Sequence, residues 1–242
     1  MADIFHRCKG KGAIYSACSI LLDFHSFFTL LCSLFYSISP SLLAILGVIV
    51  PTVYQGCYNA LTRSMEYEAA ACLRELGIRS YHYNPLAGGM LSGKYSGIDD
   101  EAMKDGGRFG SASPISGAGY SARYWHQQYF DALEGIRAAC DGAPGGVIPM
   151  AEASLRWIMN HSYLSAEHND GIIFGASSID HCVSNLDSCG KGPLPQSVLD
   201  AFTSGWKIVE SVSSGYFRGY GAAAGTSEIF LAKFQANLPP PL

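Results

Sequence analysis

Apolar and polar positions along this chain form blocks that predict alternating strands and helices from Gly47 onward. Short apolar runs typical of buried strands occur at Val48–Gln55, Ile78–Tyr83 and Gly171–Gly175. Apolar residues at helical spacing predict helices at Ser64–Leu76, Tyr124–Ala139, Pro149–His161, Ser177–Leu186 and Leu194–Ser211. This alternation favours a parallel sheet of β/α units, and strands that are apolar throughout are expected to be covered on both faces.

The connections between these elements carry further signals. Gly77 follows the first predicted helix, in the position where glycine commonly ends one. A Gly-rich turn, Asn84–Gly89, follows the second strand. Asp99–Gly119 is polar and rich in glycine and serine, and it is predicted to be a long loop, a type that is usually functional or mobile. Residues 219–242 are Gly/Ala-rich and then Pro-rich, which predicts a tail of low order.

Residues 1–46 do not continue the pattern. Basic residues within 1–12 precede an apolar stretch, and residues 26–50 carry no charge. About 20 apolar residues can cross a bilayer, so one interpretation is a membrane anchor with a cytoplasmic N-terminus, and a secretory signal is a variant of it. Five serines and Pro40 interrupt this span. They favour the other interpretation, a segment that replaces the usual sequence through an alternative or mistaken start of the coding region.

Composition narrows the class of protein. The 242 residues are 48% hydrophobic and 15% charged, which is typical of a globular chain. The net charge of −4 gives no reason to expect a nucleic-acid partner. The eight cysteines form no CxxC pair and no Cys/His cluster with zinc-ligand spacing, so no metal site is predicted. We expect free thiols in a reducing compartment, the cytoplasm.

Three stretches at predicted strand ends carry a family resemblance: Pro51–Asn59, Tyr83–Tyr95 and Ile172–Ser178, the last continuing to Asn185 and Leu186. In this order and spacing they resemble the last three strands of the aldo-keto reductase barrel. The nearest match is the aflatoxin-aldehyde reductase branch, and the potassium-channel β-subunits are more distant. The run NPLAGG-x-L-x-GKY is highly specific.

The resemblance covers about Gly47 to Arg218 and implies a fold and a domain division. The fold is a partial (β/α)₈ TIM barrel, consisting of the last three strands and their helices. Residues 47–218 would be an NADP-binding half-barrel. Residues 1–46 would be a non-matching apolar segment, and 219–242 a tail.

The resemblance also implies the roles of residues that bind the cofactor. The Gln55 amide suits the nicotinamide carboxamide, and Tyr83 would stack on the ring, although either side chain could instead be structural. Asn84–Lys94 would wrap the pyrophosphate, with glycines that allow close backbone approach and with Lys94 as a point charge; Arg108 would be a second cation. The assigned residues are Gln55, Tyr83, Asn84, Pro85, Leu86, Ala87, Gly88, Gly89, Gly93, Lys94, Arg108, Ala176, Ser177, Ser178, His181 and Asn185.

The adenosine end of the cofactor would lie at the last of the three motifs. Ser177 and Ser178 open a helix, whose N-terminus favours the 2′-phosphate, although they could also simply cap it. Asn185 matches the adenine-contacting asparagine of the family. His181 and Ser184 depart from the family, which commonly has Gln or Arg at the first position and Gln or Glu at the second. Preference for NADP over NAD therefore depends on whether His181 can act as the cation.

Tyr120 and Arg123 match substrate-side positions of the family, and Arg218 is a weaker candidate of the same kind. An arginine there would attract an aldehyde that carries a carboxylate, and Arg123 could equally be a surface charge.

The family's catalytic residues are a general-acid Tyr, an Asp–Lys pair and a His on the first four strands, and a Ser-Asn pair on the fifth strand holds the carboxamide of the cofactor. Nothing before Gly47 resembles them. No catalytic residue is therefore assigned, and we expect an NADP-dependent aldehyde or ketone reductase that is truncated. The alternatives are a non-catalytic NADP-binding or interaction protein of the same fold, and a membrane-anchored remnant. Association of open half-barrels into homo-oligomers is also expected.

Overall fold

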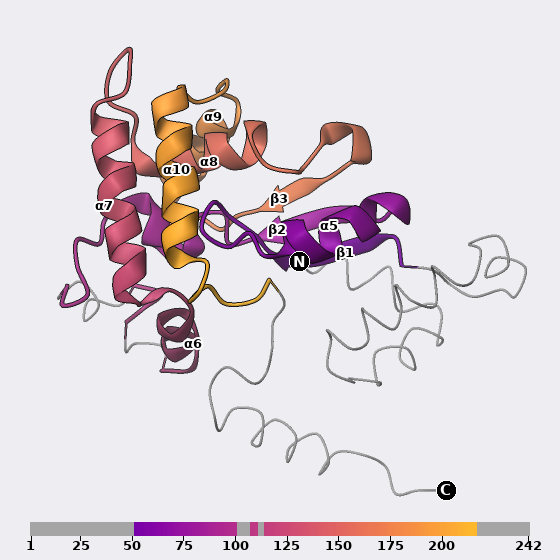
Figure 1. Ribbon diagram of the computed structural model, residues 1–242, viewed down its shortest axis with the longest axis horizontal. Helices are drawn as coiled ribbons and strands as arrows, with labels where there is room; N and C mark the ends of the chain where they lie inside the picture. The colour runs from indigo at the N-terminus through magenta and orange to yellow at the C-terminus, as the bar shows by residue number, and fades with distance from the viewer. Residues whose placement is uncertain (1–50, 101–106, 111–113, 217–242) are drawn as a thin grey trace, which may run out of the picture. The chain divides into compact units, whose positions relative to one another are not determined.

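The computed structural model describes residues 51–100, 107–110 and 114–216, which all fall in one compact unit (Figure 1). Several predictions lie outside the described residues. They are the segment 1–46, the uncharged span 26–50, the tail 219–242 and Arg218.

The sheet has the order β1-β2-β3, with all strands parallel: β1 (Val53–Cys57), β2 (Arg79–Tyr83) and β3 (Gly171–Ile173). In the register Cys57 pairs with Tyr83, and Tyr83 pairs with Ile173, so the three strands end at one edge. The predicted strands are confirmed with shifted bounds. β1 runs two residues past Gln55, and β3 ends two residues before Gly175.

Coverage of both sheet faces by apolar side chains was a wrong prediction for β1 and β2. In β1 the side chain of Tyr54 is buried, whereas Val53 and Gln55 are exposed. In β2 the buried positions are Ser80 and His82. A buried imidazole is tolerated here because both of its nitrogens are hydrogen-bonded, to the Gly56 carbonyl and to the Tyr163 hydroxyl.

Most predicted helices are confirmed within a few residues: α5 (Met65–Glu75), α7 (Gln127–Asp141), α8 (Met150–Asn160), α9 (Ile179–Cys189) and α10 (Gln196–Val209). Gly77, with a φ of 66°, lies just beyond α5, where a left-handed residue is favoured. Helices α7 and α10 lie side by side (Figure 1). They bury Leu133 and Ile136 of α7 and Phe202 and Trp206 of α10.

The predicted loop Asp99–Gly119 is wrong at its C-terminal end, where helix α6 (Pro114–Tyr124) forms. The helix predicted from Tyr124 begins instead at Gln127, after a break at Trp125 and His126. The α6 sequence includes two glycines and few aliphatic residues, so helix propensity alone disfavours it. We attribute the helix to tertiary contacts instead: Tyr120 packs on Gly88, and Tyr124 contacts Cys57 at the end of β1.

Two short 3₁₀ segments complete the described elements: η1 (Ala87–Ser92) after β2, and η3 (Ala166–His168) before β3. Within the described ranges, no helix has the length and apolar character that a membrane crossing requires. The same residues contain no group of three or more His, Cys, Asp or Glu side chains arranged to hold a metal ion. Their five cysteines, Cys57, Cys72, Cys140, Cys182 and Cys189, are free thiols.

Candidate functional site at the strand ends

The chain leaves β2 into residues Asn84–Lys94, which we call the cradle. Backbone φ is positive at Asn84 (62°), Ala87 (50°), Gly88 (71°), Gly89 (106°) and Gly93 (81°). The N–H groups of Ala87 and Gly89 donate to the carbonyls of Asn84 and Leu86, at 2.9 and 2.8 Å, and hold this tight turn. Glycine at the left-handed positions avoids strain and leaves the backbone open to close approach by a ligand.

Two cationic side chains lie close to the cradle glycines: Lys94, the last residue of the cradle, and Arg108 from the segment that follows. A Cβ built on Gly89 would lie 3.7 Å from Cε of Lys94, and one on Gly107 would lie 3.3 Å from its Nζ. Arg108 extends toward the end of the third strand, because its Nη2 would lie 3.2 Å from a Cβ on Gly175. Both cations are exposed, so both remain available to an anion at this edge of the sheet.

Helix α6 places an aromatic side chain directly on the cradle. The ring of Tyr120 lies so close to Gly88 that a Cβ there would approach it to 2.5 Å. The Tyr120 hydroxyl donates to Oδ1 of Asn84 at 3.1 Å and accepts from Nη1 of Arg108 at 2.8 Å. The structure therefore brings together Asn84, Gly88 and Arg108, all predicted for the cofactor, with Tyr120, predicted for the substrate.

A buried polar cluster lies next to this contact, and the sequence analysis missed it. Sγ of Cys57 lies 3.4 Å from the Tyr124 hydroxyl, and Nδ2 of Asn59 donates to that hydroxyl (3.4 Å) and to the Asn84 carbonyl (3.0 Å). Burial raises the pKa of the Cys57 thiol and of the Tyr124 phenol, so both are neutral near pH 7. The spacing of Tyr120 and Tyr124, one helical turn apart, was the signal available in the sequence.

Arg123 points toward the chain that follows α10. Its Nη1 donates to the carbonyl of Gly215 at 3.1 Å, and nearby the Cys57 N–H donates to the Tyr216 carbonyl at 2.8 Å. The side chain is half-buried, so the alternative of a simple surface charge does not describe it. It ties α6 to the 215–216 segment.

Gln55 and Tyr83 occupy different positions along their strands. Tyr83 is the last residue of β2 and is half-buried, as expected for a side chain at the mouth of the site. Gln55 is exposed, but it precedes the end of β1 by two residues and pairs in register with Tyr81. It therefore lies farther from the strand-end edge than the sequence predicted.

The start of α9 carries the third group of predicted residues. Oγ of Ser178 accepts from the His181 N–H at 3.2 Å, so the capping role is present. Oγ of Ser177 lies 2.9 Å from Nδ1 of His181, and both residues, like Ala176, are exposed. Asn185, by contrast, is only 9% exposed. Its side chain is thus less open to a ligand than the residues at the first turn.

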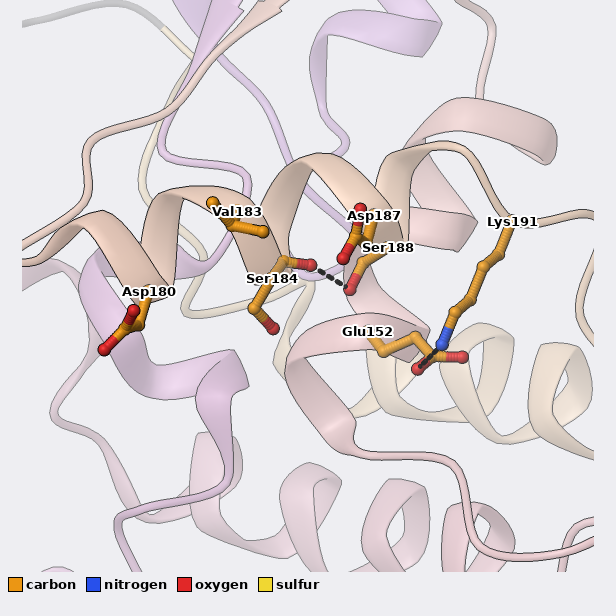
Figure 2. Close-up of a pocket in the computed structure, with 7 residues that line it drawn as sticks. All are labelled: Glu152, Asp180, Val183, Ser184, Asp187, Ser188 and Lys191. Atoms are coloured by element: carbon orange, nitrogen blue, oxygen red, sulfur yellow. Dashed lines mark hydrogen bonds and ion pairs between the residues drawn. The ribbon is translucent and has the colours of Figure 1, made fainter.

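A separate surface hollow of about 410 Å³ lies along α8 and α9 (Figure 2). Its acidic members are Glu152, Asp180 and Asp187. The Glu152 carboxylate is already paired with Lys191 (2.6 Å) and with Arg156 (3.1 Å). This hollow is lined by helix side chains rather than by the strand ends, and it contains none of the cradle residues.

Comparison with known proteins identifies the family. The model of the aldo/keto reductase family matches residues 41–207. Human aflatoxin B1 aldehyde reductase member 2 is 42% identical over 173 residues, which are 71% of this chain and 48% of that protein. Human aldo-keto reductase family 7 member A3 is also 42% identical over 173 residues, 71% of this chain and 52% of that protein.

A similar solved structure is that of the glycerol dehydrogenase AKR11B4 from Gluconobacter oxydans, at 16% identity and a TM-score of 0.48, covering 75% of this chain and 51% of that one. The chain spans about half the length of the curated relatives it matches. The family model and the curated relatives confirm the resemblance drawn from the three strand-end motifs. From the match over residues 41–207, this chain belongs to the aldo/keto reductase family.

Proposed function

We propose that the described residues form the cofactor-binding part of an aldo/keto reductase barrel and bind NADPH at the ends of β1, β2 and β3. One observation carries the proposal: Lys94 and Arg108, from separate segments, flank a turn in which Gly88 and Gly89 have positive φ. Open backbone and two exposed cations suit the pyrophosphate of a dinucleotide. The bound cofactor would supply the hydride for aldehyde reduction.

The remaining contacts to the cofactor follow from the same placement. Tyr83 ends β2 at the mouth of the site, where its ring could stack on the nicotinamide. The Gln55 amide, two residues before the end of β1, would hydrogen-bond the carboxamide. At the other end of the cofactor, Ser177, Ser178 and His181 surround the N-terminus of α9, which favours the 2′-phosphate. A small aldehyde or ketone is the proposed substrate class, and the cytoplasm suits the free thiols.

The test of cofactor binding is a fluorescence titration of the 242-residue chain with NADPH and with NADH. We expect NADPH to bind more tightly and Lys94→Ala to weaken it roughly tenfold, because a charge-assisted contact is removed. Lys207→Ala is the matched control, since Lys207 is exposed on α10 and distant in sequence from the cradle. Equal affinities for the two cofactors, or an unchanged affinity in Lys94→Ala, would contradict the assignment.

For turnover we propose that this 242-residue polypeptide is inactive. The described residues supply the cofactor site, and residues before Gly47 do not resemble the strands that hold the family's proton donor. General acid catalysis alone contributes ~10²–10⁴-fold. The assay is oxidation of NADPH with succinic semialdehyde, and turnover near the enzyme median of ~10 s⁻¹ would overturn this part of the proposal.

A second function, cofactor binding without catalysis, is favoured by the same observation, since Lys94, Arg108 and the cradle glycines all lie within the described residues. The two functions differ in one measurement. A chain in which these residues are joined to the family's first five strands reduces aldehydes if the first is correct, and binds NADPH without turnover if the second is.

A further inference from the structure

Tyr120 makes a set of contacts that a substrate-binding residue would not need. Its hydroxyl is engaged on both sides, donating to Asn84 Oδ1 (3.1 Å) and accepting from Arg108 Nη1 (2.8 Å). A phenol has one proton to donate, so this hydroxyl has none left for a substrate. It joins the cradle to the cation that lies beside it.

The ring of Tyr120 is held as firmly as the hydroxyl. Its Cδ1 and Cε1 atoms lie against Gly88. Tyr124 is stacked at a centroid distance of 6.4 Å with 27° between the planes, and Phe109 meets it edge-on at 6.0 Å. The Arg108 guanidinium carbon lies 5.5 Å from the ring centroid, within the range of a cation–π contact. Neighbouring aromatic side chains therefore hold the ring in place, and the guanidinium packs over it.

Arg108 benefits from such a support because its long side chain is exposed, and ordering a long side chain costs rotamer entropy. A guanidinium has five N–H donors in a planar fork, and the contact with Tyr120 uses one from Nη1. Nη2 extends toward Gly175, two residues beyond β3. The side chain thus spans from α6 toward the residues that follow β3, and the Tyr120 hydroxyl is its one hydrogen-bond partner among the described residues, so little ordering remains to be done when an anion arrives.

We propose that Tyr120 is the positioning residue for Arg108, holding its guanidinium across the strand ends so that it meets the anionic part of the cofactor. This inference rests on the proposed NADPH site and gives Tyr120 a role on the cofactor side in addition to the substrate-side position that it matches. It also links the order of α6 to the cradle, because the same hydroxyl is bonded to Asn84 in the turn.

A double-mutant cycle on the full chain tests this assignment. Tyr120→Phe keeps the ring and removes only the hydroxyl, and Arg108→Met removes the charge and keeps the length. We expect Tyr120→Phe to raise the Kd for NADPH by about fivefold in the otherwise unchanged chain and to have no effect in the Arg108→Met background. Tyr67→Phe is the matched control, because the Tyr67 hydroxyl accepts from Trp206 Nε1 on helices α5 and α10 and should leave Kd unchanged.

The outcomes separate the alternatives. An equal loss in both backgrounds would show that Tyr120 supports the fold rather than Arg108, and an unchanged Kd in Tyr120→Phe would overturn the proposal as well. Arg108→Lys, which keeps a charge but not the fork, should also weaken binding and should not add to Tyr120→Phe. If the unchanged chain binds no NADPH, or Lys94→Ala has no effect, the NADPH site itself fails and this inference falls with it.

Discussion

The imidazole of His82 accepts a hydrogen bond from the hydroxyl of Tyr163 while its other nitrogen faces a carbonyl. Nδ1 lies 3.1 Å from the Gly56 oxygen and must donate, so Nε2 is the acceptor. The ring is fully buried, and burial lowers the pKa of His82 to about 4, from an ordinary value of 6.5. This pair places a neutral histidine between β1, β2 and the chain before β3.

The first prediction is a loss of stability in weak acid. Because the unfolded chain binds a proton near pH 6.5 and folded His82 does so only near pH 4, stability is full above pH 6.5 and falls as the pH drops through this window. The difference amounts to about 3 kcal/mol. His161, whose pKa burial also lowers, acts in the same direction.

Urea denaturation between pH 7.5 and 4.5 measures the effect. His82→Gln should flatten the slope of unfolding free energy against pH in this range. Thr203→Ala, at an exposed position without a titratable side chain, should leave the slope unchanged. A His82→Gln slope equal to that of the unchanged chain would show that other groups cause the acid sensitivity.

The second prediction concerns the buried carboxylate of Asp170, which connects β2, α5 and the chain before β3. It is paired with Arg74 and accepts from the N–H groups of Ser80 (2.8 Å) and Ser165 (2.9 Å). Burial alone would raise the pKa of Asp170, but these bonds outweigh it and lower it. Asp170→Asn should destabilise the fold by about 3 kcal/mol.

Chemical denaturation at pH 7 would show this as a lower midpoint. Lys191→Met removes the exposed partner of Glu152 and is the control, since an exposed pair contributes about 0–1 kcal/mol. Similar losses for the two substitutions would mean that the Asp170 network is not a principal support of the sheet.

The third prediction compares two glycines with nearly the same φ. Gly77 has a φ of 66° with nothing within 4 Å of a Cβ, whereas Gly88 has a φ of 71° and a Cβ there would meet Tyr120 at 2.5 Å. Gly77→Ala should cost only the left-handed strain, about 1 kcal/mol. Gly88→Ala should cost roughly 1–3 kcal/mol more, because the ring must move. Thermal unfolding of both variants measures the difference, and equal losses would contradict the close packing of Tyr120 on the cradle.

The fourth prediction addresses cofactor preference at the start of α9. His181 lies beside Ser177, where the 2′-phosphate is proposed to bind. His181→Arg adds a permanent cation with a fork suited to phosphate, and it should increase the ratio of NADPH to NADH affinity roughly tenfold. His168→Arg is the control for added charge alone. A ratio unchanged by His181→Arg would place the 2′-phosphate elsewhere.

The fifth prediction follows from the reversed polarity of α9. Ile179, Val183 and Leu186 are 82%, 51% and 56% exposed, whereas Asn185 and Ser188 are buried. An apolar stripe of this kind promotes association. We expect the purified chain to elute larger than a monomer, and the double variant Val183→Lys/Leu186→Lys to shift toward the monomer. Val147→Lys, at a loop residue 68% exposed, should leave the elution unchanged. Light scattering that shows a monomer for the unchanged chain would refute the prediction.

Local patterns in the sequence were sufficient for most elements. Helix α5 and its end at Gly77 follow from residues next to one another in the chain, as does β2, which begins one residue after its predicted start. The glycines of the cradle are equally local, because a left-handed turn favours glycine whatever surrounds it. The specific run NPLAGG-x-L-x-GKY identified the family, because a motif of consecutive residues can be recognised from their order alone, without knowing how they pack.

Tertiary structure alone decided the features that depend on residues distant in the sequence. The formation of α6, the burial of His82 and the exposed stripe of α9 each run against local propensity or polarity. The position of Tyr120 between Asn84 and Arg108 joins three segments, and the sequence analysis placed Tyr120 with the substrate. The physical reason is that propensity and periodicity act over a few residues, whereas burial and hydrogen-bond partners are set by which elements the fold brings into contact.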